Sequence, residues 1–204
     1  MAALVRWAGR HPGWWLLVYL VVTGVMYQTA ARAPLYDPFA IAPSALDDAI
    51  PIVGWTAYPY MTYFALMPSF VWLARAHPRA GALLVAAGLC VVGNLTINTL
   101  VPTELARPLT VAETGGGLLA MVVDGDTPRV VLPSGHVALP LALALLSLRH
   151  GVGPRWLYPT WTVVMSAVVL TTKQHVVVDV LGGWAWGTIG PLVMERAVGL
   201  RRGR

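Results

Sequence analysis

The sequence predicts an all-α, polytopic membrane protein that forms one domain over residues 1–204. Three observations support this prediction: an apolar composition, six apolar stretches of helix length, and basic residues that gather in alternate loops. Hydrophobic residues make up 57% of the chain and charged residues only 11%, whereas charged residues make up about a quarter of an ordinary soluble domain. The composition therefore favours a chain whose surface faces lipid.

Six stretches of the chain meet or approach the roughly 20 apolar residues that a helix needs to cross a bilayer. They cover residues 14–31, 55–74, 81–101, 134–148, 157–172 and 176–198. The first stretch could instead be a signal peptide, because Arg6 and Arg10 precede it. Its apolar core is long and begins with two tryptophans, so we expect an uncleaved span. No internal repeat or second domain is evident, and we predict six transmembrane helices.

The basic residues predict the orientation of these spans. If the N-terminus is cytoplasmic, ten of the 14 Lys and Arg residues lie in cytoplasmic segments, as expected for loops that stay inside. Four would lie outside: Arg32, Arg107, Arg129 and Lys173. Both termini are then cytoplasmic, and the compact, Ala/Val/Arg-rich sequence indicates a bacterial inner membrane. Basic residues that flank the spans explain the net charge of +5, so we expect no nucleic-acid partner.

The two long outside loops carry local signals of their own. In loop 33–54, Ser44 could begin a short interfacial helix. In loop 102–133, the glycine run 115–117 lacks the Gly-Lys-Ser/Thr of a phosphate-binding loop, and we expect a flexible link there. The sequence Asp-Gly-Asp at 124–126 is typical of a turn rather than of a calcium site. The single cysteine, Cys90, excludes an internal disulfide and is expected in the core or facing lipid.

Three polar clusters fall where predicted spans end on the outside, so all three share one membrane face. They are Arg107 with Pro108 after the third span, residues 133–136 at the start of the fourth, and residues 173–179 at the start of the sixth. Ionisable groups at such ends can serve only as interfacial anchors. Their convergence favours a functional site, because ionisable groups within membranes are usually functional.

The chemistry of these clusters suits an anion, specifically a phosphate. Ser134 is a good N-cap, and Gly135 leaves the first N–H groups of the following helix open, which makes an anion-binding helix end. Arg107 offers a planar fork of donors that matches phosphate oxygens. Lys173 would add a further positive charge.

Two histidines and an aspartate could supply the reaction. His175 and Asp179 are four residues apart, which places them on one face of a helix. A carboxylate on one ring nitrogen leaves the other nitrogen as a nucleophile or base. His136 would then act as general acid. This set predicts phosphoryl transfer without a metal or other cofactor.

The expected depth of His136 favours a lipid substrate. The 17 residues from Pro133 to Arg149 span about 25 Å of helix, against about 30 Å of hydrocarbon. His136 should therefore lie just below the outer surface, where the phosphate is that of a lipid headgroup.

At these residues the chain resembles the type-2 phosphatidic acid phosphatase superfamily of membrane lipid phosphatases and phosphotransferases. The family motifs are KxxxxxxRP, PSGH and SRxxxxxHxxxD. The chain has RP at 107–108, PSGH at 133–136 and HVVVD at 175–179. The family lysine is replaced by Leu100, and the Ser-Arg pair by Val-Val at 168–169.

The resemblance implies a role for each matching residue. His175 attacks the phosphorus and becomes a phosphohistidine, Asp179 orients it, and His136 protonates the leaving oxygen. The phosphoryl oxygens are held by Arg107, Lys173, Ser134 and Gly135. The family to which this pattern belongs needs no metal.

Because the chain departs from the family motifs at these positions, three functions stay open: two kinds of enzyme and one protein without catalytic activity. We expect first a hydrolase of a lipid phosphate or diphosphate. The segments VPTELARP and TKQHVVVDVLGG are similar to those of inositol phosphorylceramide synthases, which favours a transferase that moves a phospho-headgroup to a lipid alcohol. A small transporter or scaffold with a degenerate site is the third interpretation.

Three side-chain patterns predict packing rather than chemistry. Gly183 and Gly187 form a small-xxx-small pair for close helix contact. Asn94 and Asn98 are expected to bond across helices. Trp186 is expected in packing or in contact with a lipid tail.

Overall fold

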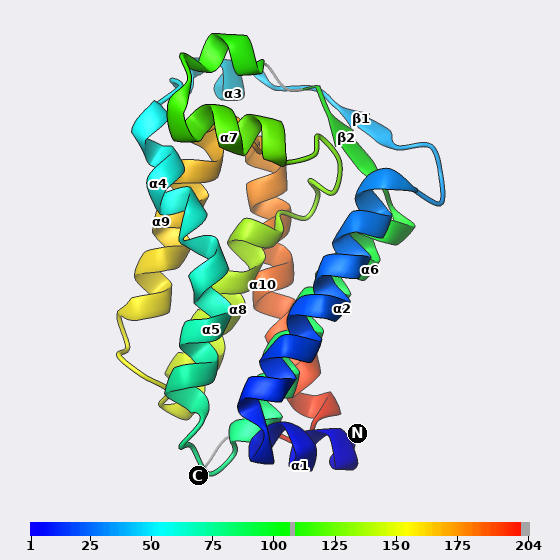
Figure 1. The fold of residues 1–204 in the computed structure, drawn as a ribbon, viewed down its shortest axis with the longest axis vertical. Helices are drawn as coiled ribbons and strands as arrows, with labels where there is room; N and C mark the ends of the chain where they lie inside the picture. Colours follow the sequence, from blue (N-terminus) through cyan, green and yellow to red (C-terminus); the bar gives the residue numbers. More distant parts are fainter. Residues whose placement is uncertain (107–108, 201–204) are drawn as a thin grey trace.

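The computed structural model describes residues 1–106 and 109–200 and shows a mainly helical chain (Figure 1). The first half contains α1 (Ala2–Arg10), α2 (Pro12–Arg32), β1 (Phe39–Ile41), α3 (Ala45–Ala49), η1 (Gly54–Thr56), α4 (Ala57–Met61), α5 (Tyr63–Ala74) and α6 (Ala80–Leu100). The second half contains β2 (Thr103–Leu105), η2 (Val111–Thr114), α7 (Gly117–Gly125), α8 (Gly135–His150), α9 (Leu157–Thr171) and α10 (Val177–Ala197).

Each of the six apolar stretches forms helix. Three helices, α2, α6 and α10, are long and apolar enough to cross a membrane, and α9 is a shorter apolar helix. Many large apolar side chains on α2 are exposed in the part of the chain that the structure describes, as is typical of a surface that meets lipid or a partner.

The second stretch does not form one helix. It is divided at Thr62 into α4 and α5. The hydroxyl and the backbone N–H of Thr62 both donate to the carbonyl oxygen of Pro59, at 2.5 and 3.1 Å, which tightens the chain into a 3₁₀-like turn. The remaining 12 residues of α5 span only about 18 Å.

The long helices run side by side along one axis, while α1 lies across one end and α7 across the other (Figure 1). Helix α1, which the apolar stretches do not predict, crosses α6 at close range. A Cβ atom at Gly81 would lie 2.0 Å from the carbonyl oxygen of Val5, so only glycine permits this contact. The end covered by α7 is called the capped end below.

The capped end contains structure that an all-α prediction misses. Strands β1 and β2, three residues each, pair in parallel with Phe39 opposite Thr103. The expected helix after Ser44 is present as α3, and the Ser44 hydroxyl caps it by accepting from the Asp47 N–H at 3.3 Å. The glycines at 115–117 all have positive φ, from 70° to 90°. They form the turn that links η2 to α7, and the flexibility expected of this link stays a prediction.

Close contact between α8 and α10 brings the starts of these two helices together. A Cβ atom at Gly183 would lie 2.8 Å from the carbonyl oxygen of Ser134, and one at Gly187 would lie 2.9 Å from that of Ala138. The small-xxx-small prediction is confirmed. Because the backbones touch here, the Ser134 N–H donates to the carbonyl oxygen of Asp179 at 3.1 Å, and the PSGH segment lies beside the first turn of α10.

Candidate active site

His175 lies in the turn between α9 and α10, and Asp179 lies in the first turn of α10. Lys173 has a φ of 57° and reverses the chain after α9. The N–H groups of Gln174 and His175 then both donate to the carbonyl oxygen of Val169, at 3.1 Å. The four-residue spacing was expected to act along a helix, but His175 precedes α10.

Asp179 orients the imidazole of His175. One carboxylate oxygen, Oδ2, accepts from the Val176 N–H at 3.1 Å and lies 3.3 Å from Nδ1 of His175. Asp179 is fully buried, and His175 is 5% exposed. With Nδ1 directed at the carboxylate, Nε2 is the nitrogen left for chemistry.

His136 faces that nitrogen from the start of α8. Its Nδ1 lies 3.4 Å from Nε2 of His175, and the ring centroids are 5.6 Å apart. The rings of Tyr60 and Tyr63 pack on His136, with centroids 4.6 and 4.3 Å away. The sequence therefore predicted correctly that the two histidines and the aspartate meet.

The PSGH segment is held rigidly beside them. Nδ2 of Asn94 and Nδ2 of Asn98, both on α6, donate to the carbonyl oxygen of Pro133 at 3.2 and 3.3 Å, which confirms the expected bonding across helices. A Cβ atom at Gly135 would lie 3.3 Å from Oδ1 of Asn94, so a side chain there would crowd the α6 contact. Oγ of Ser134 and Oδ1 of Asp179 are buried and have no partner among the described residues.

Lys173 lies elsewhere than predicted. Its Nζ donates to the carbonyl oxygens of Asp47 and Ile50, each at 2.6 Å, and its side chain does not line the cavity that contains the histidines. The ammonium anchors the α3 segment over the α9–α10 turn. The structure therefore gives Lys173 a structural contact in place of the expected phosphate contact. Arg107, also expected to hold phosphate, lies outside the described residues.

Asp47 completes this anchor. Its Oδ1 accepts from the Val177 N–H at 2.7 Å, and its Oδ2 accepts from the Ser44 hydroxyl at 2.6 Å. Burial raises the pKa of Asp47, but these hydrogen bonds and the nearby Lys173 ammonium outweigh burial and hold that pKa below its ordinary value. The anchor thus holds α3 against the residue that begins α10, two positions after His175.

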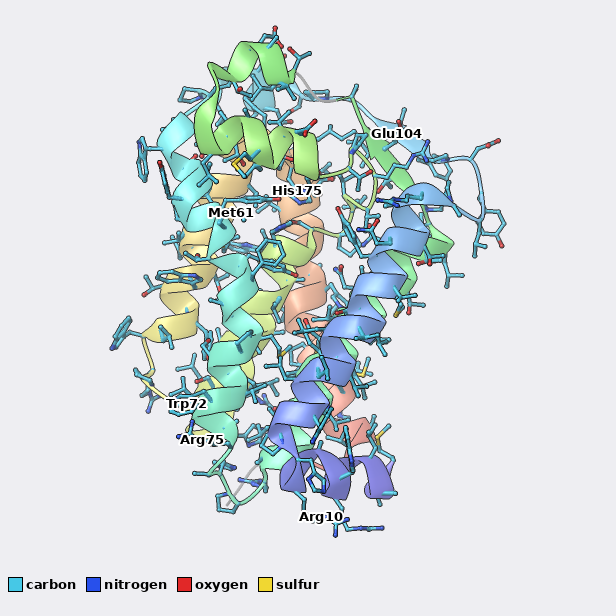
Figure 2. All side chains as sticks on the ribbon, viewed as in Figure 1. Arg10, Met61, Trp72, Arg75, Glu104 and His175 are labelled. Carbon is cyan, nitrogen blue, oxygen red and sulfur yellow. The ribbon has the colours of Figure 1, made fainter. Side chains whose placement is uncertain are left out.

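The histidines open into a cavity of about 500 Å³. Figure 2 shows His175 in the upper part of the bundle, below α7. The polar end of the cavity is lined by Asn94, Asp126, Arg129, Gly135, His136, Gln174 and His175. An apolar arm, lined by residues of α2, α5, α8 and α10, continues from this end and is defined by Tyr19, Leu20, Gly24, Met67, Leu139 and Trp186.

Two residues at the polar end were missed by the sequence analysis. Asp126, expected in a simple turn, accepts hydrogen bonds from the hydroxyls of Tyr27 and Tyr60 at 2.5 and 3.0 Å. Arg129 lines the same cavity. A signal for Arg129 existed, because it is one of only four basic residues in the predicted outside segments.

Among the residues described, no group of three or more His, Cys, Asp or Glu side chains is placed to hold a metal ion.

Comparison of the chain with protein-family models, with curated proteins and with solved structures finds no match.

Proposed function

We propose that this chain is an integral membrane enzyme that removes a phosphoryl group from a lipid phosphate or diphosphate through a phosphohistidine at His175. One observation carries the proposal: Asp179, His175 and His136 form a continuous line of side chains that ends in a cavity. The motif resemblance supports the same assignment of roles.

The first step follows from the orientation of the ring. Asp179 holds Nδ1 of His175, so Nε2 carries the lone pair that attacks phosphorus. The P–O bond to the leaving group breaks as the P–N bond forms. His136, in its protonated state, gives its proton to the departing oxygen. The substrate must separate Nε2 from Nδ1 of His136, because the phosphoryl group occupies the space between them.

The second step regenerates the enzyme. Water attacks the phosphorus, His136 takes a proton from that water, and the P–N bond returns its electron pair to His175. The buried Oγ of Ser134 and the N-terminal end of α8 supply donors and positive potential for the phosphoryl oxygens. We assign Arg107 to the same oxygens on the strength of the motif.

The apolar arm supports a lipid as substrate. Tyr19 and Tyr27 both line the cavity, and their separation on α2 corresponds to about 12 Å. One leaflet of the hydrocarbon core is about 15 Å deep. A single cavity thus joins the imidazoles to an apolar space about as deep as a lipid chain.

We further propose six membrane spans, cytoplasmic termini, a bacterial inner membrane and a site at the outer face. The three predicted spans other than α2, α6 and α10 would cross with the help of their neighbours. They are α8, α9, and α4 with α5 as one broken span. Figure 2 supports this orientation, because Arg10 and Arg75 lie at the end of the bundle opposite His175. Basic residues at that end match cytoplasmic loops.

The test uses the purified full chain in detergent with a panel of lipid monophosphates and diphosphates. We expect release of inorganic phosphate, unaffected by a chelator and lost in His175→Ala. Transfer of the headgroup to an added lipid alcohol with little free phosphate would instead establish the transferase. Activity of His175→Ala equal to that of the parent would refute both, and would leave the scaffold interpretation.

A further inference from the structure

A phosphorylated headgroup needs positive charge beyond that of imidazole. Among the described residues that line the cavity, Arg129 is the one Lys or Arg side chain. Lys173 is bonded to main-chain carbonyls away from the cavity. The contacts of Arg129 therefore determine which part of a substrate this side chain can reach.

The backbone around Arg129 is fixed against β2. The Arg129 N–H donates to Oγ1 of Thr127 at 3.2 Å, and Arg129 forms an antiparallel bridge with Glu104. The next residue, Val130, has a φ of 63°, a conformation that is strained for a β-branched side chain. Such strain costs about 1–3 kcal/mol and is concentrated at functional sites. A strained, tethered loop thus presents Arg129 at the cavity.

The guanidinium is held from one side and open on the other. Nε donates to Oε2 of Glu104 at 3.2 Å, and Nη1 donates to the carbonyl oxygen of Ala31 at 3.3 Å. An arginine has five N–H groups, so three remain without a partner among the described residues. A planar, preoriented fork of this kind matches phosphate oxygens.

Arg129 and His136 line the same cavity but are held there by different elements. Ala31 and Glu104 place Arg129 on the wall formed by the end of α2 and by β2. Tyr60 and Tyr63 place His136 on the wall formed by α4 and α5. The apolar arm is lined by α2, the helix whose end also holds Arg129, so a substrate chain in the arm would lie beside the element that holds Arg129.

We propose that Arg129 binds the lipid-linked phosphate of a diphosphate substrate while His175 attacks the terminal phosphate. This inference rests on the proposed function and narrows its substrate class to lipid diphosphates. The bond between the terminal phosphorus and the bridging oxygen breaks, and His136 protonates that oxygen. The leaving group is the lipid monophosphate, whose charge Arg129 stabilises. Water then releases inorganic phosphate from His175.

The test compares dodecyl diphosphate with dodecyl monophosphate as substrates of the purified full chain. In Arg129→Gln, kcat/KM for the diphosphate should fall about 10- to 100-fold, the effect of losing a charged hydrogen bond. For the monophosphate, kcat/KM should change less than about threefold, because this substrate has no second phosphate for Arg129 to bind. Arg32→Gln is the matched control, since Arg32 is an exposed arginine at the end of α2, next to the Ala31 that Arg129 contacts, and lies outside the cavity. It should leave kcat/KM for both substrates unchanged.

An equal loss for both substrates, or no loss for either, overturns the assignment of Arg129. A binding measurement separates this failure from failure of the proposed function. Dodecyl diphosphate should bind His175→Ala at least about tenfold more tightly than it binds the double variant His175→Ala/Arg129→Gln. That difference is expected even if the parent chain turns over no lipid, and its absence counts against Arg129 alone.

Discussion

A buried histidine lies beside a carboxylate at each end of the paired helices α8 and α10, and the two ends differ in what surrounds the imidazole. At the capped end, His175 contacts Asp179 and faces His136 and the cavity. At the other end, Nε2 of His150 lies 2.8 Å from Oε1 of Glu195, a shorter contact than the 3.3 Å of the first pair.

The second partner of Glu195 is a cation, whereas that of Asp179 is the Val176 N–H. Nε and Nη2 of Arg149 donate to the two carboxylate oxygens of Glu195 at 2.9 and 2.7 Å. No cavity described in the structure is lined by His150, Arg149 or Glu195. Under the proposed function, a histidine–carboxylate pair alone is therefore not sufficient for chemistry. The capped end differs in having space and a second imidazole in front of the ring.

The largest expected effect is on activity when the histidine of each pair is replaced. His175→Ala should lower kcat/KM for a lipid diphosphate by at least about 10⁴-fold, because the nucleophile is lost. His150→Ala should leave kcat/KM within about twofold and lower the melting temperature, because it removes only a structural contact of Glu195. Steady-state phosphate release and a thermal unfolding scan measure the two effects, and a comparable loss of activity in His150→Ala would erase the distinction.

The carboxylates should give the next largest difference. Asp179→Asn should lower kcat by about 10²- to 10⁴-fold, since an amide no longer fixes the correct tautomer of His175. Glu195→Gln should retain activity but lose about 3 kcal/mol of stability, because Arg149 and His150 lose a buried anion. Activity assays and denaturant titration on both variants test whether one carboxylate supports activity and the other supports stability. A fully active Asp179→Asn would show that the carboxylate does not act through the ring.

A third prediction concerns the space that distinguishes the capped end. Gly24 lines the apolar arm, and a Cβ atom there meets nothing within 4 Å. Gly24→Trp should lower kcat/KM for hexadecyl diphosphate about tenfold by blocking the arm, with little effect on butyl diphosphate. Gly13→Trp is the control, because Gly13 is on the same helix with the same open surroundings but outside the cavity. Equal effects on both chain lengths would contradict a chain-binding arm.

The smallest expected effect concerns Asp47, which supports the capped end from outside the site. Because the folded-state pKa of Asp47 is lowered, its carboxylate stabilises the fold above the unfolded-state pKa. That stabilisation is lost as the pH falls through the lower folded-state value. Asp47→Asn should therefore cost about 1–2 kcal/mol at neutral pH and little in strong acid. Melting temperatures across pH, with Asp48→Asn as control, test the sign; a penalty that is constant with pH would refute it.

The sequence predicted the elements whose signal is local. Apolar stretches located the main helices, Ser44 marked the start of α3, and the spacing of Gly183 and Gly187 identified the α8–α10 contact. The motif residues His136, His175 and Asp179 could be placed together because each lies at the end of a predicted span on the same side.

The rest depends on tertiary contacts that no local pattern contains. Lys173 was assigned to phosphate from its proximity in sequence to His175, but a long side chain can turn either way, and the carbonyl groups at the end of α3 bind it. The parallel pairing of β1 with β2 joins segments more than sixty residues apart. Arg129 lies in no motif, and only the folded loop shows that it reaches the cavity.

The most direct test of the central claim is to trap the covalent intermediate. His136→Ala, given an aryl phosphate whose leaving group needs no protonation, should form the phosphoenzyme and hydrolyse it slowly. Peptide mass spectrometry after an alkaline quench should then find one phosphoryl group, labile to acid, on the peptide that contains His175. A phosphoryl group on another residue, or complete turnover of the substrate with no covalent adduct at any time, would contradict the account.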